Sequence, residues 1–256
     1  MPFDPSKWKP KFSPSVATTF IPCPSCEKFE LEAGELKSGQ TRDSWLANDE
    51  PESPLEYMSR FVLLLKCKSC KETVAVAGLM HAVEEMYEGQ EETVSVETLI
   101  PRMIEPPPKL FPIPKATPTE VTDVVNQAFR LYWFDRDACA SRLRTAVELF
   151  LTKEGIADKR TNGAWENMSV RLSEYEAKEP SIGKKLQAVK WLGHTGTHRP
   201  GGVNLESIND ALVIISAALE ERYEHRKANE LADEIIAKKG PRSPVAISKI
   251  GPHEST

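Results

Sequence analysis

Apolar residues follow two different periods along the chain. Before residue 105 they come in short runs and alternations, such as 61–65 and 73–77, which are typical of β-strands. From residue 118 onward they recur every three or four positions, and this spacing predicts amphipathic helices. Residues 105–118 hold six prolines, which exclude a helix or a central strand. The pattern predicts an α+β fold by segment, in which a small β domain precedes an all-α helical bundle.

The same pattern predicts the segment boundaries. We expect an irregular arm over 1–20, a β domain over 21–104, a proline-rich linker over 105–117, a helical bundle over 118–238 and a disordered tail over 239–256. The arm contains Trp8 and Phe12 among prolines, lysines and serines, and we expect it to lie on the body of the protein. The linker is predicted to be stiff and extended, and to limit contacts between the two domains.

Five helices are predicted in the bundle, at about 118–133, 139–151, 165–176, 182–198 and 204–238. Each carries an apolar stripe at helical spacing, and Gly155 is placed to stop the second helix. Cys139 lies in the stripe of that helix, so we expect it to pack as a small apolar side chain. Short connections between the helices favour a bundle.

Composition and charge exclude some classes of protein. With 40% hydrophobic and 28% charged residues, the chain has the composition of a soluble globular protein. Its formal net charge of -5 arises in residues 1–115, which contain 13 basic and 18 acidic residues, so neither part is a basic nucleic-acid binder overall. No apolar run approaches the roughly 18 residues that a membrane helix needs, and the first residues lack the apolar region of a secretory signal. We therefore expect a cytoplasmic protein that contacts no membrane.

Four of the five cysteines form two Cys-x2-Cys pairs: Cys23 with Cys26, and Cys67 with Cys70. Each pair can present two thiolates to one tetrahedral metal, and a set of four thiolates suits a structural Zn2+ with no open position for catalysis. The alternative is a pair of disulfides or free thiols, and a reducing compartment disfavours the disulfides. The strand-like apolar runs on either side of the second pair complete the pattern of a zinc-ribbon-like domain.

This domain is predicted to be larger than a simple ribbon. The gap between the cysteine pairs exceeds the usual roughly 15 to 20 residues, and the polar, acidic stretch at Gly34–Tyr57 predicts an inserted loop. Four lysines near the thiolates either balance the charge of the metal site or touch nucleic acid: Lys28, Lys66, Lys68 and Lys71. Because six acidic residues between Glu84 and Glu97 would repel phosphates, protein contact is the favoured interpretation.

The end of the fourth predicted helix carries the residues with the most distinctive chemistry. Lys190, His194 and His198 are spaced four apart, so they lie on one helix face. Gly193 and Gly196 are poor helix formers, and their presence indicates that another helix approaches closely. A proline and two glycines follow at positions 200–202, which places His198 in or near the last helical turn.

Two stretches, LRTAVELF at Leu143–Phe150 and VKWLGHTGTH at Val189–His198, resemble signatures of the HEPN-like domain of unknown function 4145 family. The resemblance extends over about residues 118–226 and implies a HEPN-like bundle. Members of this family often carry a cysteine-knuckle segment ahead of the bundle, and are often found with restriction and phage-defence proteins. In the wider HEPN superfamily, active members are metal-independent ribonucleases with an Arg, four to six residues and a His, and two protomers often bring these motifs together.

The chain departs from the nuclease motif of that superfamily. His198 occupies the position of the motif histidine, but Gly193-His194 stand where the nuclease would have Arg-Asn. The one upstream cation on the same helix face is Lys190, and an ammonium is not a bidentate substitute for a guanidinium. A general acid/base is therefore present, whereas the motif's phosphate-binding group is missing.

Three functional interpretations remain open at this point. The first, favoured because the motif Arg is missing, is a noncatalytic interaction module that forms a homodimer or pairs with a defence protein. The second is a metal-independent endoribonuclease in which His198 is the general acid/base, His194 its partner, and Lys190 or Arg144 the phosphate clamp. The third takes His194 and His198 as metal ligands, although no third ligand is evident. Arg144 and Glu148, four apart, form either a solvated ion pair or a buried functional pair.

Overall fold

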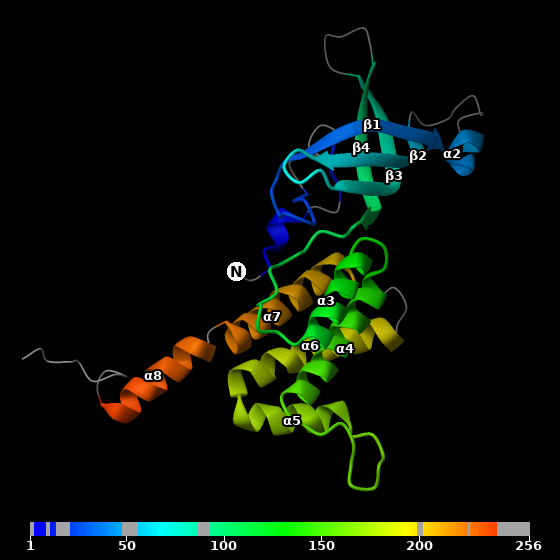
Figure 1. Cartoon of the computed structure of the whole chain (residues 1–256). Coiled ribbons are helices and arrows are strands. Elements are labelled where there is room, and N and C mark those ends of the chain that lie inside the picture. The colour runs from blue at the N-terminus through cyan, green and yellow to red at the C-terminus, as the bar shows by residue number, and fades with distance from the viewer. Residues whose placement is uncertain are drawn as a thin grey trace, which may run out of the picture.

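The computed structural model describes residues 3–8, 11–13, 21–47, 56–86, 93–198, 202–224 and 226–239. In this part of the chain, a four-stranded antiparallel sheet precedes a set of helices, which confirms the predicted α+β architecture. Figure 1 shows the sheet at one end of the molecule and the helices at the other, with the short helix η1 (Pro5–Lys7) between them.

The sheet is formed by four strands that pair in chain order: β1 (Leu31–Gln40), β2 (Glu56–Cys67), β3 (Thr73–Met86) and β4 (Thr93–Glu105). Helix α2 (Arg42–Ala47) connects β1 to β2. The strands predicted at 61–65 and 73–77 are confirmed as parts of β2 and β3, and both strands extend further.

The predicted inserted loop at Gly34–Tyr57 is wrong in its first part. Residues 34–40 belong to β1, which pairs with β2 up to the partners Gln40 and Ser59. Because β1 is an edge strand in which Leu31 is the one buried residue, it lacks the alternation of apolar and polar residues that marks a half-buried strand. Residues 48–55 of the predicted loop lie outside the described residues.

The two faces of the sheet have different surroundings. In β2, Phe61, Leu63 and Leu65 are buried in the core, whereas Val62 and Leu64 between them are each 52% exposed. This alternation follows from the strand geometry, in which successive side chains point to opposite faces. The sheet therefore packs one face inward and leaves the other open.

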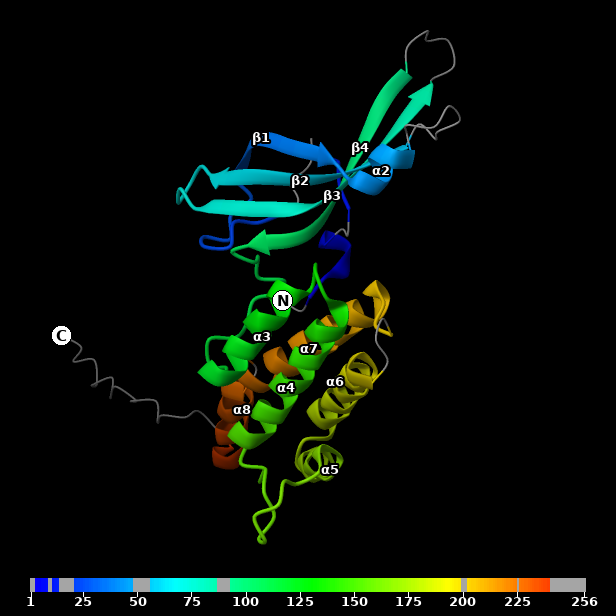
Figure 2. The same ribbon diagram turned by 90° about the vertical axis from the view of Figure 1, so that its right-hand side faces the viewer.

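Within the described residues, six helices follow the sheet: α3 (Thr119–Leu131), α4 (Arg136–Lys153), α5 (Met168–Lys178), α6 (Pro180–His198), α7 (Leu205–Tyr223) and α8 (Arg226–Lys238). Helix α4 lies between α3 and α6, as Figure 2 shows. The first, second and fourth predicted helices are confirmed as α3, α4 and α6. Among these described helices, none is both long and apolar enough to cross a membrane.

Two of the five predicted helices need correction. The third begins at Met168 instead of Trp165, because the side chain of Asn167 accepts a hydrogen bond from the backbone N–H of Ser169 and caps the helix. The fifth is two helices, since α7 ends at Tyr223 and α8 begins at Arg226. No proline or glycine marks this break in the sequence. The predicted tail lies outside the described residues apart from Lys239.

Cys139 packs as the sequence predicted. Its side chain is fully buried in α4, and the thiol donates to the carbonyl of Ala128 in α3 at 3.2 Å. Burial raises the pKa of the Cys139 thiol far above its ordinary value. The thiol is therefore neutral and contributes to the contact between the two helices.

The arm and the linker both pack into the core. The backbone N–H of Phe3 donates to Ser216 Oγ in α7 at 2.8 Å. The indole of Trp8 donates to the carbonyl of Leu110 in the linker at 3.1 Å, and its ring packs edge-on against Trp133. Leu110 and the next residue in the linker are buried. The described part of the arm thus lies on the body as expected, whereas the linker contacts both parts of the chain instead of separating them.

Candidate functional site

The four paired cysteines come together at the end of β2 and the segment before β1. The sulfur atoms of Cys23, Cys26, Cys67 and Cys70 all lie within 4.8 Å of one another. Two distances between the pairs are 3.5 Å and 3.6 Å, for Cys23 to Cys70 and Cys26 to Cys67. A tetrahedral metal with bonds of roughly 2.3 Å separates its sulfur ligands by about 3.8 Å. A disulfide needs about 2.05 Å, so the geometry fits a metal site and not disulfides.

The two cysteine pairs have the same backbone conformation. In the first, the N–H of Glu27 donates to the carbonyl of Cys23 at 2.8 Å, and Glu27 has a φ of 61°. In the second, the N–H of Lys71 donates to the carbonyl of Cys67 at 3.0 Å, and Lys71 has a φ of 68°. Left-handed backbone is uncommon for such residues. Its occurrence at equivalent positions shows that both turns are shaped to bring two sulfurs to one point.

Backbone N–H groups within these turns stabilise thiolates. The N–H of Cys70 is the main cause that lowers the pKa of the Cys67 thiol to about 7. Burial raises the pKa of the Cys23 thiol, and hydrogen bonds from the backbone N–H groups of Cys26 and Ser25 partly offset this rise. Metals bind the deprotonated form of cysteine. The net effect differs among the four thiols. The pKa of Cys67 is lowered, whereas the pKa values of Cys23, Cys26 and Cys70 are raised.

The lysines near the cysteines are held by neighbouring side chains and carbonyls. Lys28 Nζ donates to Ser69 Oγ at 2.8 Å, and Lys68 Nζ lies 2.9 Å from a carboxylate oxygen of Glu32. Lys71 Nζ donates to the carbonyl of Lys68 at 2.7 Å. These contacts connect the two cysteine turns and the start of β1.

Lys190 in α6 is buried, not displayed on an open helix face. Its side chain donates to Ser169 Oγ in α5 at 2.6 Å, and its Nζ lies 4.3 Å from the ring centre of Trp191. The residue is 8% exposed. Burial lowers the pKa of Lys190, and the positive charge of Arg144 lowers it further. Two cations from α4 and α6, one half-buried and one buried, thus lie close together.

Arg144 and Glu148 form the expected pair on α4. Arg144 Nε lies 3.4 Å from a carboxylate oxygen of Glu148, and the two side chains are 27% and 42% exposed. The pair is therefore half-buried, between the solvated and the buried alternatives that the sequence left open. It lies beside a hollow of about 450 Å³, which Trp165 and Arg171 also line.

At Gly193, helix α6 lies close against α4. A Cβ atom at Gly193 would lie 2.7 Å from Cβ of Arg144 and 2.8 Å from the carbonyl oxygen of Ala140. The prediction of a close helix contact at Gly193 is confirmed. Residues 194–198 continue α6, but their side chains lie outside the described part of the structure. His194 and His198 are therefore placed only by their backbone positions in the last turns of α6.

Arg171 is a buried cation that the sequence analysis did not single out. One of its terminal nitrogens donates to Thr152 Oγ1 at 2.8 Å and to the carbonyl of Ile156 at 3.1 Å. Through these bonds Arg171 ties α5 to the end of α4 and satisfies a carbonyl beyond it. In the sequence, the one sign of a buried Arg171 is its position next to Leu172 in an apolar stripe. That position does not reveal the hydrogen-bond partners of the arginine.

Two family models match separate parts of the chain. Residues 126–239 match a family described as a domain of unknown function (DUF4145), which agrees with the resemblance drawn from Leu143–Phe150 and Val189–His198. Residues 11–104 match a second domain of unknown function (DUF8608), which covers the cysteine cluster and the sheet. No curated protein and no solved structure matches the chain.

Proposed function

We propose that the chain is a noncatalytic HEPN-like interaction module, preceded by a zinc-ribbon-like domain with a structural Zn2+. The match of residues 126–239 to the first family and the resemblance of its two motifs to HEPN-like sequences support the assignment of the bundle. The association of that family with restriction and phage-defence proteins supports a partner of this kind, or a second copy of the chain.

The donor set supports zinc as the occupant of the cysteine site. Cys23, Cys26, Cys67 and Cys70 would hold the ion with four thiolates, for which Zn2+ is the usual metal when nothing suggests redox chemistry. All four positions of a tetrahedral ion would be filled by the protein. The ion would therefore join the segment before β1 to the β2–β3 turn, and would supply no catalysis.

The packing at Gly193 carries the proposal that the bundle is noncatalytic. By the resemblance, Gly193 stands where an active superfamily member has the motif Arg. At this position even a Cβ atom would lie 2.7 Å from Arg144 and 2.8 Å from a backbone oxygen of α4. The space that the motif side chain would need is occupied by another helix.

Neither nearby cation replaces the missing guanidinium. Lys190 uses its ammonium within the bundle, on Ser169 and against the ring of Trp191. Arg144 is paired with Glu148. A phosphate clamp at this site would have to break the contacts of Lys190 with Ser169 and of Arg144 with Glu148.

One observation favours the ribonuclease as a second candidate. Arg144 and Lys190 are close enough for the first to lower the pKa of the second, and they lie on the two helices that form the motif site. With His198 as general acid/base and His194 beside it, the helix end would hold the residue types that RNA cleavage needs. A partner or substrate would first have to rearrange the pairs just described.

Cleavage of a fluorescent single-stranded RNA by the purified full chain in EDTA tests the proposal. We expect no cleavage by the wild type, and a lower melting temperature or a shift from dimer to monomer for His198→Ala, measured by scanning calorimetry and light scattering. The control is His253→Ala, which changes a histidine far from the motif in sequence. EDTA-resistant cleavage that is lost in His198→Ala, kept in His253→Ala, and unaccompanied by unfolding would establish the ribonuclease instead.

A further inference from the structure

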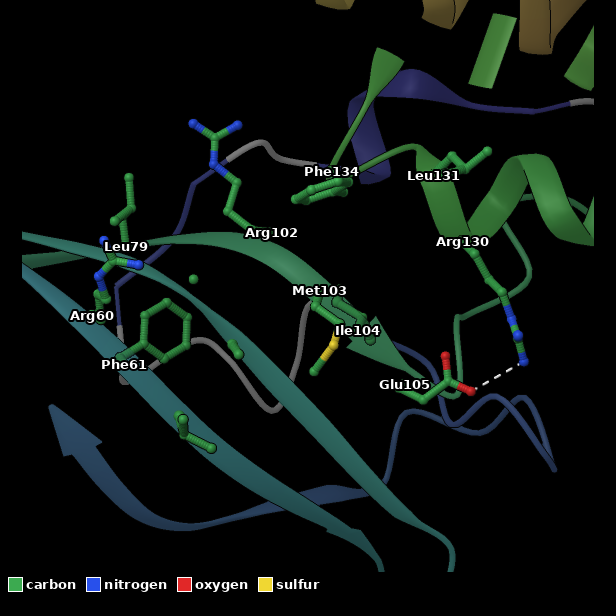
Figure 3. Close-up of a pocket in the computed structure, with 13 residues that line it drawn as sticks. Arg60, Phe61, Leu79, Arg102, Met103, Ile104, Glu105, Arg130, Leu131 and Phe134 are labelled. Carbon is green, nitrogen blue, oxygen red and sulfur yellow. Dashed lines mark hydrogen bonds and ion pairs between the residues drawn. The ribbon is translucent and has the colours of Figure 1, made fainter. Parts of the chain in front are cut away.

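A groove of about 690 Å³ lies on the open face of the sheet, where β2, β3 and β4 meet the end of α3. Figure 3 shows Arg60 and Leu79 on one side of it, Met103 near its middle, and Phe134, from the turn after α3, on the opposite side. Its volume lies within the range of binding sites for small molecules and peptide side chains, roughly 300 to 1,000 Å³.

Apolar side chains form the floor and one wall of the groove. Strand register places Val62, Ala77 and Met103 directly opposite one another on adjacent strands. Val62 is 52% exposed, Met103 48% and Phe134 69%. Leu64, two residues beyond Val62, extends the same face. Single exposed apolar residues are normal, whereas a contiguous group of this kind marks an interaction site.

The sequence of β2 agrees with a partner on this face. A sheet with one face in water alternates apolar and polar residues, but residues 61–65 of β2 are all apolar. Phe61, Leu63 and Leu65 account for the core face. Val62 and Leu64 have no such role within the chain, and contact with another molecule would bury them.

The rim of the groove is positively charged. Arg60 precedes Val62 on the same face, and Arg102 is the extra residue of the bulge in β4 between Pro101 and Met103. Both arginines are exposed, and neither guanidinium group has a hydrogen bond or ion pair with another residue of the described chain. The one acidic side chain of the lining, Glu105, is paired with Arg130 at 3.1 Å.

We propose that this groove binds a short peptide segment of a partner protein, with large apolar side chains on the floor and acidic residues on Arg60 and Arg102. Unpaired guanidinium groups beside an apolar floor complement carboxylates on an apolar segment. Exposed Arg, Met and aromatic residues are enriched at protein interfaces. A nucleic acid is a poorer occupant for two reasons. The net charge of -5 repels phosphates, and the two unpaired arginines of the rim are too few to offset that repulsion along a phosphate backbone.

The inference rests on the proposed function as an interaction module. It names one binding surface of that module and the chemistry of the partner. The surface lies on the sheet and the end of α3, and no residue of α6 is among those that line it.

The test is a selection of phage-displayed random 16-residue peptides for binding to the immobilised wild-type full chain. The affinity of the enriched peptides is then measured by fluorescence polarisation. We expect enrichment of peptides that combine acidic and large apolar residues. Their affinity should fall at least about tenfold in the double variant Arg60→Glu/Arg102→Glu, and by a similar factor in Phe134→Ser. All three residues are exposed, so the variants should keep the wild-type circular dichroism.

Matched control variants change residues of the same types elsewhere on the surface. Arg42→Glu in α2 and Phe29→Ser, at an exposed position before β1, should bind the selected peptides like the wild type. Selected peptides without an acidic excess, or peptides that bind the double variant as tightly as the wild type, would overturn the proposal. It would also be overturned if the double variant lost self-association in sedimentation, which would make the occupant a second copy, or if polyuridine displaced the peptides. RNA cleavage by the wild type would refute the noncatalytic module without affecting the peptide result, so the two failures are distinguishable.

Discussion

Replacing Gly193 by Ala tests the helix contact that carries the proposed function. A Cβ at this position would be 2.7 Å from Cβ of Arg144 and 2.8 Å from the carbonyl oxygen of Ala140. Ordinary contact begins at 3.4 Å, so the overlap is 0.6 to 0.7 Å. The backbone oxygen of α4 cannot move as a flexible side chain can. The variant therefore has to separate α4 from α6 or strain both helices.

Two opposing effects set the size of the change. Overpacking of this kind costs about 1 to 3 kcal/mol, whereas Ala in a helix interior is about 1 kcal/mol more favourable than Gly. The overlap with a rigid atom makes the first effect the larger one. We expect Gly193→Ala to lower the free energy of unfolding by about 1 to 2 kcal/mol, which for a chain of this size lowers the melting temperature by about 3 to 6 °C.

Urea unfolding followed by circular dichroism measures the effect. Gly39→Ala in β1 is the control, because a Cβ there would meet nothing within 4 Å, and we expect its stability to stay within about 0.5 kcal/mol of the wild type. A Gly193→Ala variant as stable as the wild type would refute the argument, since helix propensity would then outweigh the contact. That result would mean that the two helices can accommodate a side chain at Gly193, and it would strengthen the case for the ribonuclease.

Three further predictions concern the rest of the fold. Native mass spectrometry should find one zinc ion per chain, lost in Cys26→Ser together with part of the thermal stability, and a folded wild-type chain without metal would contradict the zinc assignment. Trp8→Ala should lower the free energy of unfolding by about 3 to 5 kcal/mol in urea titrations, since Trp8 is buried against Trp133 and the linker, whereas Trp45→Ala at an exposed position should have little effect. Burial holds the pKa of Lys190 in the folded chain below its ordinary value of 10.5, which the unfolded chain keeps. At a pH between the folded and the unfolded pKa, the unfolded chain therefore binds more protons than the folded chain. The free energy of unfolding should therefore rise as the pH rises through that interval, and this rise should be absent from urea unfolding curves of Lys190→Met. Equal pH dependence of the two proteins would contradict a buried charge at Lys190.

Predictions from the sequence were most successful where one local rule acts alone. Helical spacing with an apolar stripe predicted α3, α4 and α6, and the cysteine spacing predicted the cluster of four cysteines that could hold a metal. The glycine at position 193 predicted a close helix contact, because glycine in a helix interior is costly without one. The sequence predicted a linker that limits contacts between the two domains, whereas the buried part of the linker gives the two parts a shared core.

The sequence by itself determined the order of the β and helical parts, the two cysteine pairs that come together, and the resemblance of the bundle, since each depends on residue types at fixed spacing. Tertiary structure alone decided the rest. The edge strand β1 forms because β2 offers it a hydrogen-bonding partner, not because its own residues alternate. Lys190 is buried because α5 packs against it and Ser169 Oγ accepts a hydrogen bond from its ammonium, which no spacing within α6 reveals. Arg60, Val62 and Met103 border one groove because strand pairing joins positions that are forty residues apart in the chain, and contacts at such separation are set by the fold and not by local pattern.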